Sequence, residues 1–109
     1  TSVNHHPQVF EYQRQPELCE HEPNGRYPII LAGNTCLAGD LFGEYRFNMP
    51  LLVGDKVVFK QVGAYSLVKA NRFNGYNLPD IYLTNGGQVK RIKQHSYQDY
   101  RQQWAGDSQ

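Results

Sequence analysis

A glycine-rich polar stretch at residues 33–45, with the sequence GNTCLAGDLFGEY, most constrains how this chain can fold. Its three glycines oppose a helix, and its polar side chains are unsuited to a central strand. The stretch therefore predicts a loop whose backbone closely approaches another group. Cys36 and Asp40 are the reactive side chains in this loop, and they need hydrogen-bond partners wherever water is excluded.

Most of the remaining chain has the pattern of strands and turns. Asn24-Gly25 predicts a turn that joins the preceding segment to a buried strand as a hairpin, and residues 85–87 (NGG) predict a second hairpin. Residues 63–68 (GAYSLV) indicate a second glycine-led loop, and residues 73–76 another turn. From β-branched and aromatic content we expect strands at residues 7–13, 26–32, 45–47, 56–60, 80–84 and 88–92.

A helix is predicted only at residues 96–104. Ser96 suits the N-cap, Asp99 occupies the third helical position, aromatic residues form one stripe, and Gly106 can end the helix. Everything else is expected to be strand and turn. The predicted fold class is mainly β, a small sandwich or barrel with a short C-terminal helix.

The size and charge of the chain limit its class. Its 109 residues suit a single domain, and a formal charge of +1 with interspersed signs gives no footprint for nucleic acid or an anionic membrane. No apolar run approaches the length of a membrane span, and no export leader is visible. We expect reduced thiols at Cys19 and Cys36 in a cytoplasmic protein. Because the sequence opens without Met, we expect a fragment of a longer molecule.

Several residues have a functional and a structural interpretation. Cys36 is either a small buried hydrophobe or an acid or nucleophile, and its flanking glycines favour the second. Asp40 either caps a turn or holds a substrate ammonium, and Tyr65 is either a core aromatic or a phenol that contacts a phosphate or carboxylate. His5 and His6, on an extended segment, would point to opposite faces. No metal site is predicted, and the residues alone assemble no complete catalytic set.

Three segments together resemble a known family: residues 33–40 (GNTCLAGD), 63–66 (GAYS) and 73–75 (FNG). They are similar to the C-terminal β domain of the fold-type III pyridoxal-phosphate decarboxylases, which include ornithine, diaminopimelate and carboxynorspermidine decarboxylases. Leu37-Ala38 stands where ornithine enzymes place an acid and diaminopimelate enzymes place Glu-Ser. Cys-Leu-Ala-Gly-Asp before Phe-Gly-Glu-Tyr instead resembles the carboxynorspermidine branch.

The resemblance implies that residues 1–109 form the C-terminal β domain of a decarboxylase in polyamine biosynthesis. A (β/α)8 barrel, absent from this chain, would supply the Schiff-base lysine and most of the binding site for pyridoxal 5'-phosphate. This chain alone would therefore be inactive. The expected partners are that barrel, a second subunit in a homodimer, and a carboxylated triamine substrate. Alternatives are a diaminopimelate-type decarboxylase domain or a non-catalytic β-sandwich binding module.

The resemblance also implies roles for individual residues. Cys36 would be the catalytic acid that reaches the partner subunit's cofactor and protonates the substrate α-carbon. Asp40 would help to form the loop and contact a substrate amine. The remaining implied roles are a hydrogen bond to the cofactor phosphate from Tyr65, close subunit approach at Gly63, and substrate binding by Phe73 and Asn74.

Overall fold

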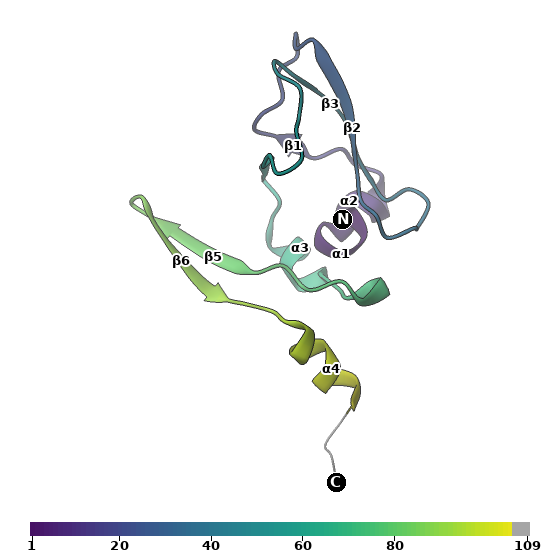
Figure 1. Cartoon of the computed structure of the whole chain (residues 1–109), viewed down its shortest axis with the longest axis vertical. Coiled ribbons are helices and arrows are strands. Elements are labelled where there is room, and N and C mark those ends of the chain that lie inside the picture. The colour runs from purple at the N-terminus through teal and green to yellow at the C-terminus, as the bar shows by residue number, and fades with distance from the viewer. Residues whose placement is uncertain (106–109) are drawn as a thin grey trace.

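The computed structural model of the protein describes residues 1–105 as short helices and three small sheets (Figure 1). In chain order the elements are α1 (Ser2–His5), α2 (Pro7–Tyr12), β1 (Glu17–Leu18), β2 (Tyr27–Ala32), β3 (Leu41–Phe47), β4 (Phe59–Lys60), α3 (Ala64–Lys69), the 3-10 helix η1 (Phe73–Gly75), β5 (Ile81–Asn85), β6 (Gln88–Lys93) and α4 (Tyr97–Ala105).

Each sheet is an antiparallel pair. β2 pairs with β3, so that Tyr27 lies opposite Phe47, and a bulge interrupts the register after Leu31. β1 pairs with β4, and β5 with β6. Figure 1 shows α1, α2 and α3 in the middle, the β2–β3 pair extending to one side, and the β5–β6 hairpin and α4 on the other. Several of the predicted strands and the short C-terminal helix are confirmed, whereas separate pairs do not confirm the predicted sandwich or barrel.

The strand predicted at residues 7–13 is wrong, because this segment forms helix α2. Pro7 lies at the first helical position, where its fixed φ fits and no backbone N–H is needed. Val9 turns inward and is buried, and the helix ends at Gln13 in the left-handed conformation. So short a helix depends on packing against its neighbours.

The glycine-led loop predicted at residues 63–68 is helix α3, which begins after Gly63 at φ +79°. A positive φ of this size favours glycine over any residue with a side chain. Gly63 thus marks a sharp change of direction into a helix and not an extended loop. Together with α1 and α2, this element makes the prediction of strand and turn everywhere before residue 96 wrong.

The turn predicted at Asn24-Gly25 is present but is centred on Pro23-Asn24, and the Gly25 N–H closes it by donating to the Glu22 carbonyl at 2.9 Å. The predicted hairpin is nevertheless wrong, because β2 pairs with the later strand β3 and not with the segment before the turn. A Cβ at Gly25 would lie 2.6 Å from the Phe47 carbonyl oxygen, so this glycine permits the close approach of β3. The strand predicted at residues 56–60 is reduced to Phe59–Lys60.

The buried core is small. Leu18, Tyr45 and Phe47 form its centre, with Phe42 stacked on Phe59 beside them at 4.5 Å between ring centroids. Every residue of β6 is exposed. The radius of gyration is 16.2 Å, against about 13 Å for a compact domain of this length. The chain is therefore less compact than a single domain of its length, and β6 adds no buried side chain to the core.

The predicted N-cap of the C-terminal helix is confirmed. The Ser96 N–H donates to Asp99 Oδ2 at 2.8 Å, and the Asp99 N–H donates to Ser96 Oγ at 3.4 Å. These are the two reciprocal bonds of a capping box. The expected end at Gly106 lies outside the described residues.

Replacing Ser96 with alanine should destabilise α4 by about 1 kcal/mol, because one N-terminal amide loses its acceptor. Hydrogen exchange in the full-length protein should then accelerate about fivefold at the Asp99 and Tyr100 amides, which donate to the Ser96 hydroxyl and carbonyl oxygens. Gln98→Ala is the control, since Gln98 is exposed on the same helix. Equal acceleration in both variants would contradict a capping role.

Candidate functional site

The segment 33–40, hereafter the Cys36 loop, connects the end of β2 to the start of β3. The paired strands hold its two ends together, and the Gly33 N–H donates to the Asp40 carbonyl at 2.8 Å. Cys36 is exposed at φ +68°, a conformation that residues other than glycine rarely adopt. The Cys36 thiol is therefore free and exposed to solvent, as a functional cysteine requires.

Asp40 fixes the base of the Cys36 loop. The residue is 5% exposed, and its carboxylate accepts hydrogen bonds from Thr35 Oγ1 at 2.6 Å and the Thr35 N–H at 3.2 Å. The Ser2 N–H and Ser2 Oγ donate to its other oxygen at 2.8 and 2.7 Å. Burial by itself would raise the pKa of Asp40, but the bonds from Thr35 and Ser2 outweigh it and lower the pKa to about 2.

Gly33 shows why the loop needs glycine at its start. A Cβ placed there would overlap the Asp40 carboxylate. The predicted close approach of backbone to another group is therefore internal, because the loop closes around its own aspartate.

The 3-10 helix η1 and the residue after it hold the Cys36 loop from the opposite side. Asn74 Nδ2 donates to the Thr35 carbonyl at 2.5 Å. The Tyr76 hydroxyl donates to the Asn34 carbonyl at 2.8 Å and lies 2.6 Å from Asn34 Oδ1. The structure thus brings two segments of the predicted site together.

Phe73 and Leu37 line a shallow depression of about 360 Å³ beside the Cys36 loop, with Val3, Pro7, Phe10, Glu11 and Asn71. Phe73 is 47% exposed and Leu37 is 40% exposed. Apolar side chains therefore border the surface around the loop. The predicted contact of Phe73 with a substrate stays a prediction.

Helix α1 contributes buried polar residues that the sequence did not reveal. Asn4 is fully buried, and its Nδ2 donates to the Phe73 carbonyl at 3.0 Å and to Asn71 Oδ1 at 3.0 Å. Ser2, also fully buried, donates to Asp40 as described. Short polar residues near the start of a sequence carry no signal for such long-range contacts.

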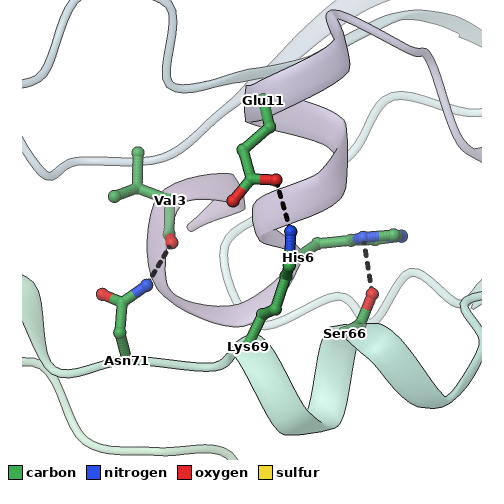
Figure 2. Close-up of polar contacts among 6 residues, drawn as sticks. All are labelled: Val3, His6, Glu11, Ser66, Lys69 and Asn71. Carbon is green, nitrogen blue, oxygen red and sulfur yellow. Dashed lines mark hydrogen bonds and ion pairs between the residues drawn. The ribbon is translucent and has the colours of Figure 1, made fainter.

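Three polar contacts join helix α3 and the segment after it to α1, α2 and the residue between them (Figure 2). Lys69 Nζ lies 2.7 Å from Glu11 Oε2, and Asn71 Nδ2 donates to the Val3 carbonyl at 2.8 Å. Ser66 Oγ lies 3.0 Å from Nδ1 of His6, whose pKa burial lowers. These contacts fix the direction in which α3 carries the next candidate residues.

Tyr65 and Gly63 lie at the start of α3. The Tyr65 side chain is 67% exposed, so the interpretation as a core aromatic is wrong. No atom lies within 4 Å of a Cβ built on Gly63, so the surface there is open. The predicted phosphate contact and subunit contact at these residues stay predictions.

The two adjacent histidines have different partners. His5 Nε2 lies 2.9 Å from the Asn77 carbonyl, whereas His6 contacts Ser66. The prediction that the two histidines lie on an extended segment is wrong, because His5 belongs to helix α1.

Two kinds of feature are absent from the described residues 1–105. No cluster of three or more His, Cys, Asp or Glu side chains is placed to hold a metal ion in this part of the chain. None of its helices has both the length and the apolar character needed to cross a membrane.

Comparisons with known proteins identify relatives of the chain, although no family model matches it. It is 42% identical over 77 residues to a carboxynorspermidine/carboxyspermidine decarboxylase of Herminiimonas arsenicoxydans, which covers 70% of this chain and 21% of that protein. It is 36% identical over 100 residues to a carboxyaminopropylagmatine decarboxylase of Synechocystis sp., covering 89% of this chain and 26% of that protein. Ornithine and diaminopimelate decarboxylases also match, at 36% and 32% identity.

A solved structure gives the same result. The crystal structure of carboxynorspermidine decarboxylase complexed with norspermidine from Campylobacter jejuni superimposes with a TM-score of 0.81 at 32% identity. The match covers 94% of this chain and 32% of that one. The resemblance predicted from the sequence is confirmed, and the chain spans about a quarter of the length of the curated relatives that it matches.

Proposed function

Since this chain is a homologue of part of the carboxynorspermidine, ornithine and diaminopimelate decarboxylases, we propose that it contributes the Cys36 loop to the active site of such an enzyme. The substrate that we propose is a carboxylated triamine, carboxynorspermidine or carboxyspermidine, which would be converted to norspermidine or spermidine. The likeness to the enzyme solved with norspermidine, over nearly the whole described chain, carries this proposal.

The exposed donors of the chain fit part of a pyridoxal-phosphate site. Tyr65 presents a phenol on the surface beside the open backbone of Gly63, and a phenol can donate to a phosphate oxygen. Cys36 presents a thiol from a loop that is fixed on two sides. We propose that Tyr65 contacts the phosphate and that a barrel elsewhere in the full-length protein supplies the lysine.

The chemistry that pyridoxal phosphate supplies when bound is withdrawal of electrons from the substrate α-carbon, which allows carbon dioxide to leave. The residues of this chain would hold and deliver a proton. Cys36 Sγ–H would donate to the α-carbon, and a new C–H bond would form as the S–H bond breaks. Solvent would then restore the proton on the resulting thiolate.

Exposed apolar side chains support a position against other protein surface. Leu67, Val68 and Trp104 are among those exposed, and Trp104 is 71% exposed. Single exposed apolar side chains are common, but the many large ones exposed along this chain favour coverage by other protein surface. We propose that the barrel and a second subunit cover these surfaces, with close approach at Gly63.

The apolar border of the Cys36 loop supports the choice of substrate. Leu37 and Phe73 offer contact to the methylene groups of a triamine and carry no charge that would hold a second amino-acid head group. Asp40 already accepts hydrogen bonds from Ser2 and Thr35, which supports a role in shaping the loop. Its contact with a substrate amine, and that of Asn74, stay predictions.

Carboxyaminopropylagmatine is a second candidate substrate, because the relative with that activity matches a larger share of this chain than the other curated relative described above. It has the same carboxylated aminopropyl end but a guanidinium at the other end. The two candidates therefore differ at the part of the substrate farthest from the reacting carbon.

A substrate panel tests the proposal in the full-length protein. We expect kcat/KM for carboxynorspermidine, carboxyspermidine or carboxyaminopropylagmatine to exceed that for diaminopimelate or ornithine by roughly 100-fold, because missing polar partners are costly in a specific site. Released carbon dioxide and the amine product are both measured. Preference for diaminopimelate would contradict the proposed substrate. If none of the compounds were decarboxylated, the proposed decarboxylase activity would be wrong.

Borohydride reduction followed by mass spectrometry supplies a test that does not depend on the substrate. We expect a pyridoxyl adduct on a lysine of the full-length protein that lies outside the 109 residues of this chain. An adduct on one of the lysines of this chain would contradict the proposed division of the site.

A further inference from the structure

We propose that Asn74 is a positioning residue for Cys36, which it orients by fixing the peptide group between Thr35 and Cys36. This inference rests on the proposed function of Cys36 as the proton donor. It follows from a polar ring formed by the Cys36 loop, η1 and α1.

Asn74 contacts the peptide group that leads into Cys36. Its Nδ2 donates at 2.5 Å to the Thr35 carbonyl, which belongs to the peptide group that ends at the Cys36 nitrogen. The orientation of that peptide group relative to the Cys36 Cα is the φ angle of Cys36, which is +68°. Because this conformation is unfavourable for a side chain such as that of cysteine, something must hold it. The Asn74 amide is placed to do so.

The support behind Asn74 is equally specific. Asn74 lies in the left-handed region itself, at φ +61° and ψ +21°, where asparagine is better tolerated than most residues. The carbonyl of the preceding residue, Phe73, accepts from the buried Asn4 at 3.0 Å. The position of the Asn74 amide is therefore set by the backbone of η1 and by α1.

The ring closes through the opposite side of the loop. From α1, Ser2 donates to Asp40, and Asp40 accepts from Thr35, whose carbonyl is held by Asn74. Ser2, Asn4, Thr35 and Asp40 supply four of the buried polar side chains in the described structure. A buried polar network that is fully bonded favours one arrangement over its alternatives. The function of this ring would be to give the Cys36 thiol one direction.

Two substitutions remove the Asn74 amide without forcing a new backbone conformation. Asn74→Gly keeps access to positive φ, and Asn74→Asp keeps the shape and this φ tolerance but replaces the donor by a carboxylate. Asn77→Asp is the matched control, since Asn77 is exposed three residues away and its backbone carbonyl accepts from His5. All variants are made in the full-length protein.

The first readout is thiol reactivity, measured as alkylation by iodoacetamide and followed by peptide mass spectrometry. Cys19 is an internal standard because it is also exposed and unpaired. We expect the alkylation rate constant of Cys36 to change at least about threefold in both Asn74 variants, while that of Cys19 stays unchanged. In Asn77→Asp, the rate constants of Cys36 and Cys19 should both stay unchanged. Equal changes at both cysteines would indicate general unfolding and overturn the inference, as would no change at Cys36.

The second readout is the split between kcat and KM. We expect kcat to fall about tenfold or more with KM within about twofold, because displacement of a reacting group slows the chemical step more than binding. In a Cys36→Ala background the same substitution should cause no further loss of kcat. A full additional loss there would show that Asn74 acts independently of Cys36, and would overturn the inference.

Failure of the proposed function is distinguishable from failure of this inference. If Cys36→Ala retained full activity, the role of Cys36 as proton donor would be wrong, and alkylation of Cys36 would still report whether Asn74 orients its thiol. If Cys36→Ala were impaired and the Asn74 variants behaved as Asn77→Asp does, only the inference would be overturned.

Discussion

Replacement of Cys36 by alanine in the full-length protein should lower kcat at least about 100-fold, the usual contribution of a positioned proton donor. KM should change little, because the thiol would act on the reacting carbon and not on the parts of the substrate that bind. The amount of polyamine formed per carbon dioxide released should also fall, since the proton could then reach another atom. Both quantities are measured with carboxynorspermidine as substrate.

Cys19→Ala is the matched control for this result. Cys19 is the other cysteine of the chain, and it is exposed and unpaired in the same way. It lies after β1 and outside the Cys36 loop, so its replacement should leave kcat and the product ratio unchanged. Wild-type turnover and product in Cys36→Ala would eliminate Cys36 as the acid.

Local chemistry explains which elements were predictable from the sequence. The β5–β6 hairpin turns at Gly86 and Gly87, both at positive φ. Because glycine adopts positive φ readily, the two adjacent glycines in the sequence were enough to predict this turn. The cap of α4 depends on Ser96 and Asp99, which are three residues apart. In both cases the determining contacts lie within a few residues of one another.

Distant contacts explain the elements that were missed. Helices α2 and α3 contain six residues each, too few to be stable through propensity alone. These helices pack against each other, and the exposed ion pair between Glu11 and Lys69 joins residues that are 58 apart in the sequence. Pro7 at the first helical position was a usable signal for α2, but Val9, Phe10 and Tyr12 resembled strand content more strongly.

The candidate site shows the same division. The glycines around Cys36 favoured a functional thiol and predicted a close backbone approach, and the structure has an exposed thiol and such an approach. The group that makes the approach, Asp40, and its partner Ser2 are 38 residues apart in the sequence. Only the folded chain shows that Asp40 connects the N-terminal helix to the loop.

Replacement of Asp40 by asparagine should therefore loosen the Cys36 loop even though the side chain keeps its shape. The carboxylate accepts from four donors, two on Ser2 and two on Thr35, whereas an amide offers one acceptor and turns a donor toward the others. Hydrogen bonds to a charged group are each worth roughly 1.5–3 kcal/mol. We expect protection of the Gly33 amide from hydrogen exchange to fall about 30-fold at pH 6 in the full-length protein, which corresponds to about 2 kcal/mol.

The pH dependence of this effect follows from the depressed pKa of Asp40. Its pKa falls from 3.8 to about 2 on folding, so the charged form stabilises the native loop by about 2 kcal/mol. This contribution is fully present above pH of about 4 and is lost as the pH falls through about 2, where the folded carboxylate takes up its proton. The difference in protection between wild type and Asp40→Asn should therefore shrink between pH 4 and pH 2.

Asp55→Asn controls for loss of a carboxylate as such. Asp55 Oδ2 accepts from the Leu52 N–H at 2.8 Å in an exposed turn, far along the chain from the Cys36 loop. Its replacement should leave Gly33 protection unchanged at every pH. If the Asp40→Asn difference stayed constant down to pH 2, its cause would be the shape of the amide and not the lost charge. If no difference existed at pH 6, Asp40 would not anchor the loop, and the polar ring that orients Cys36 would keep only the link to α1 through Asn4.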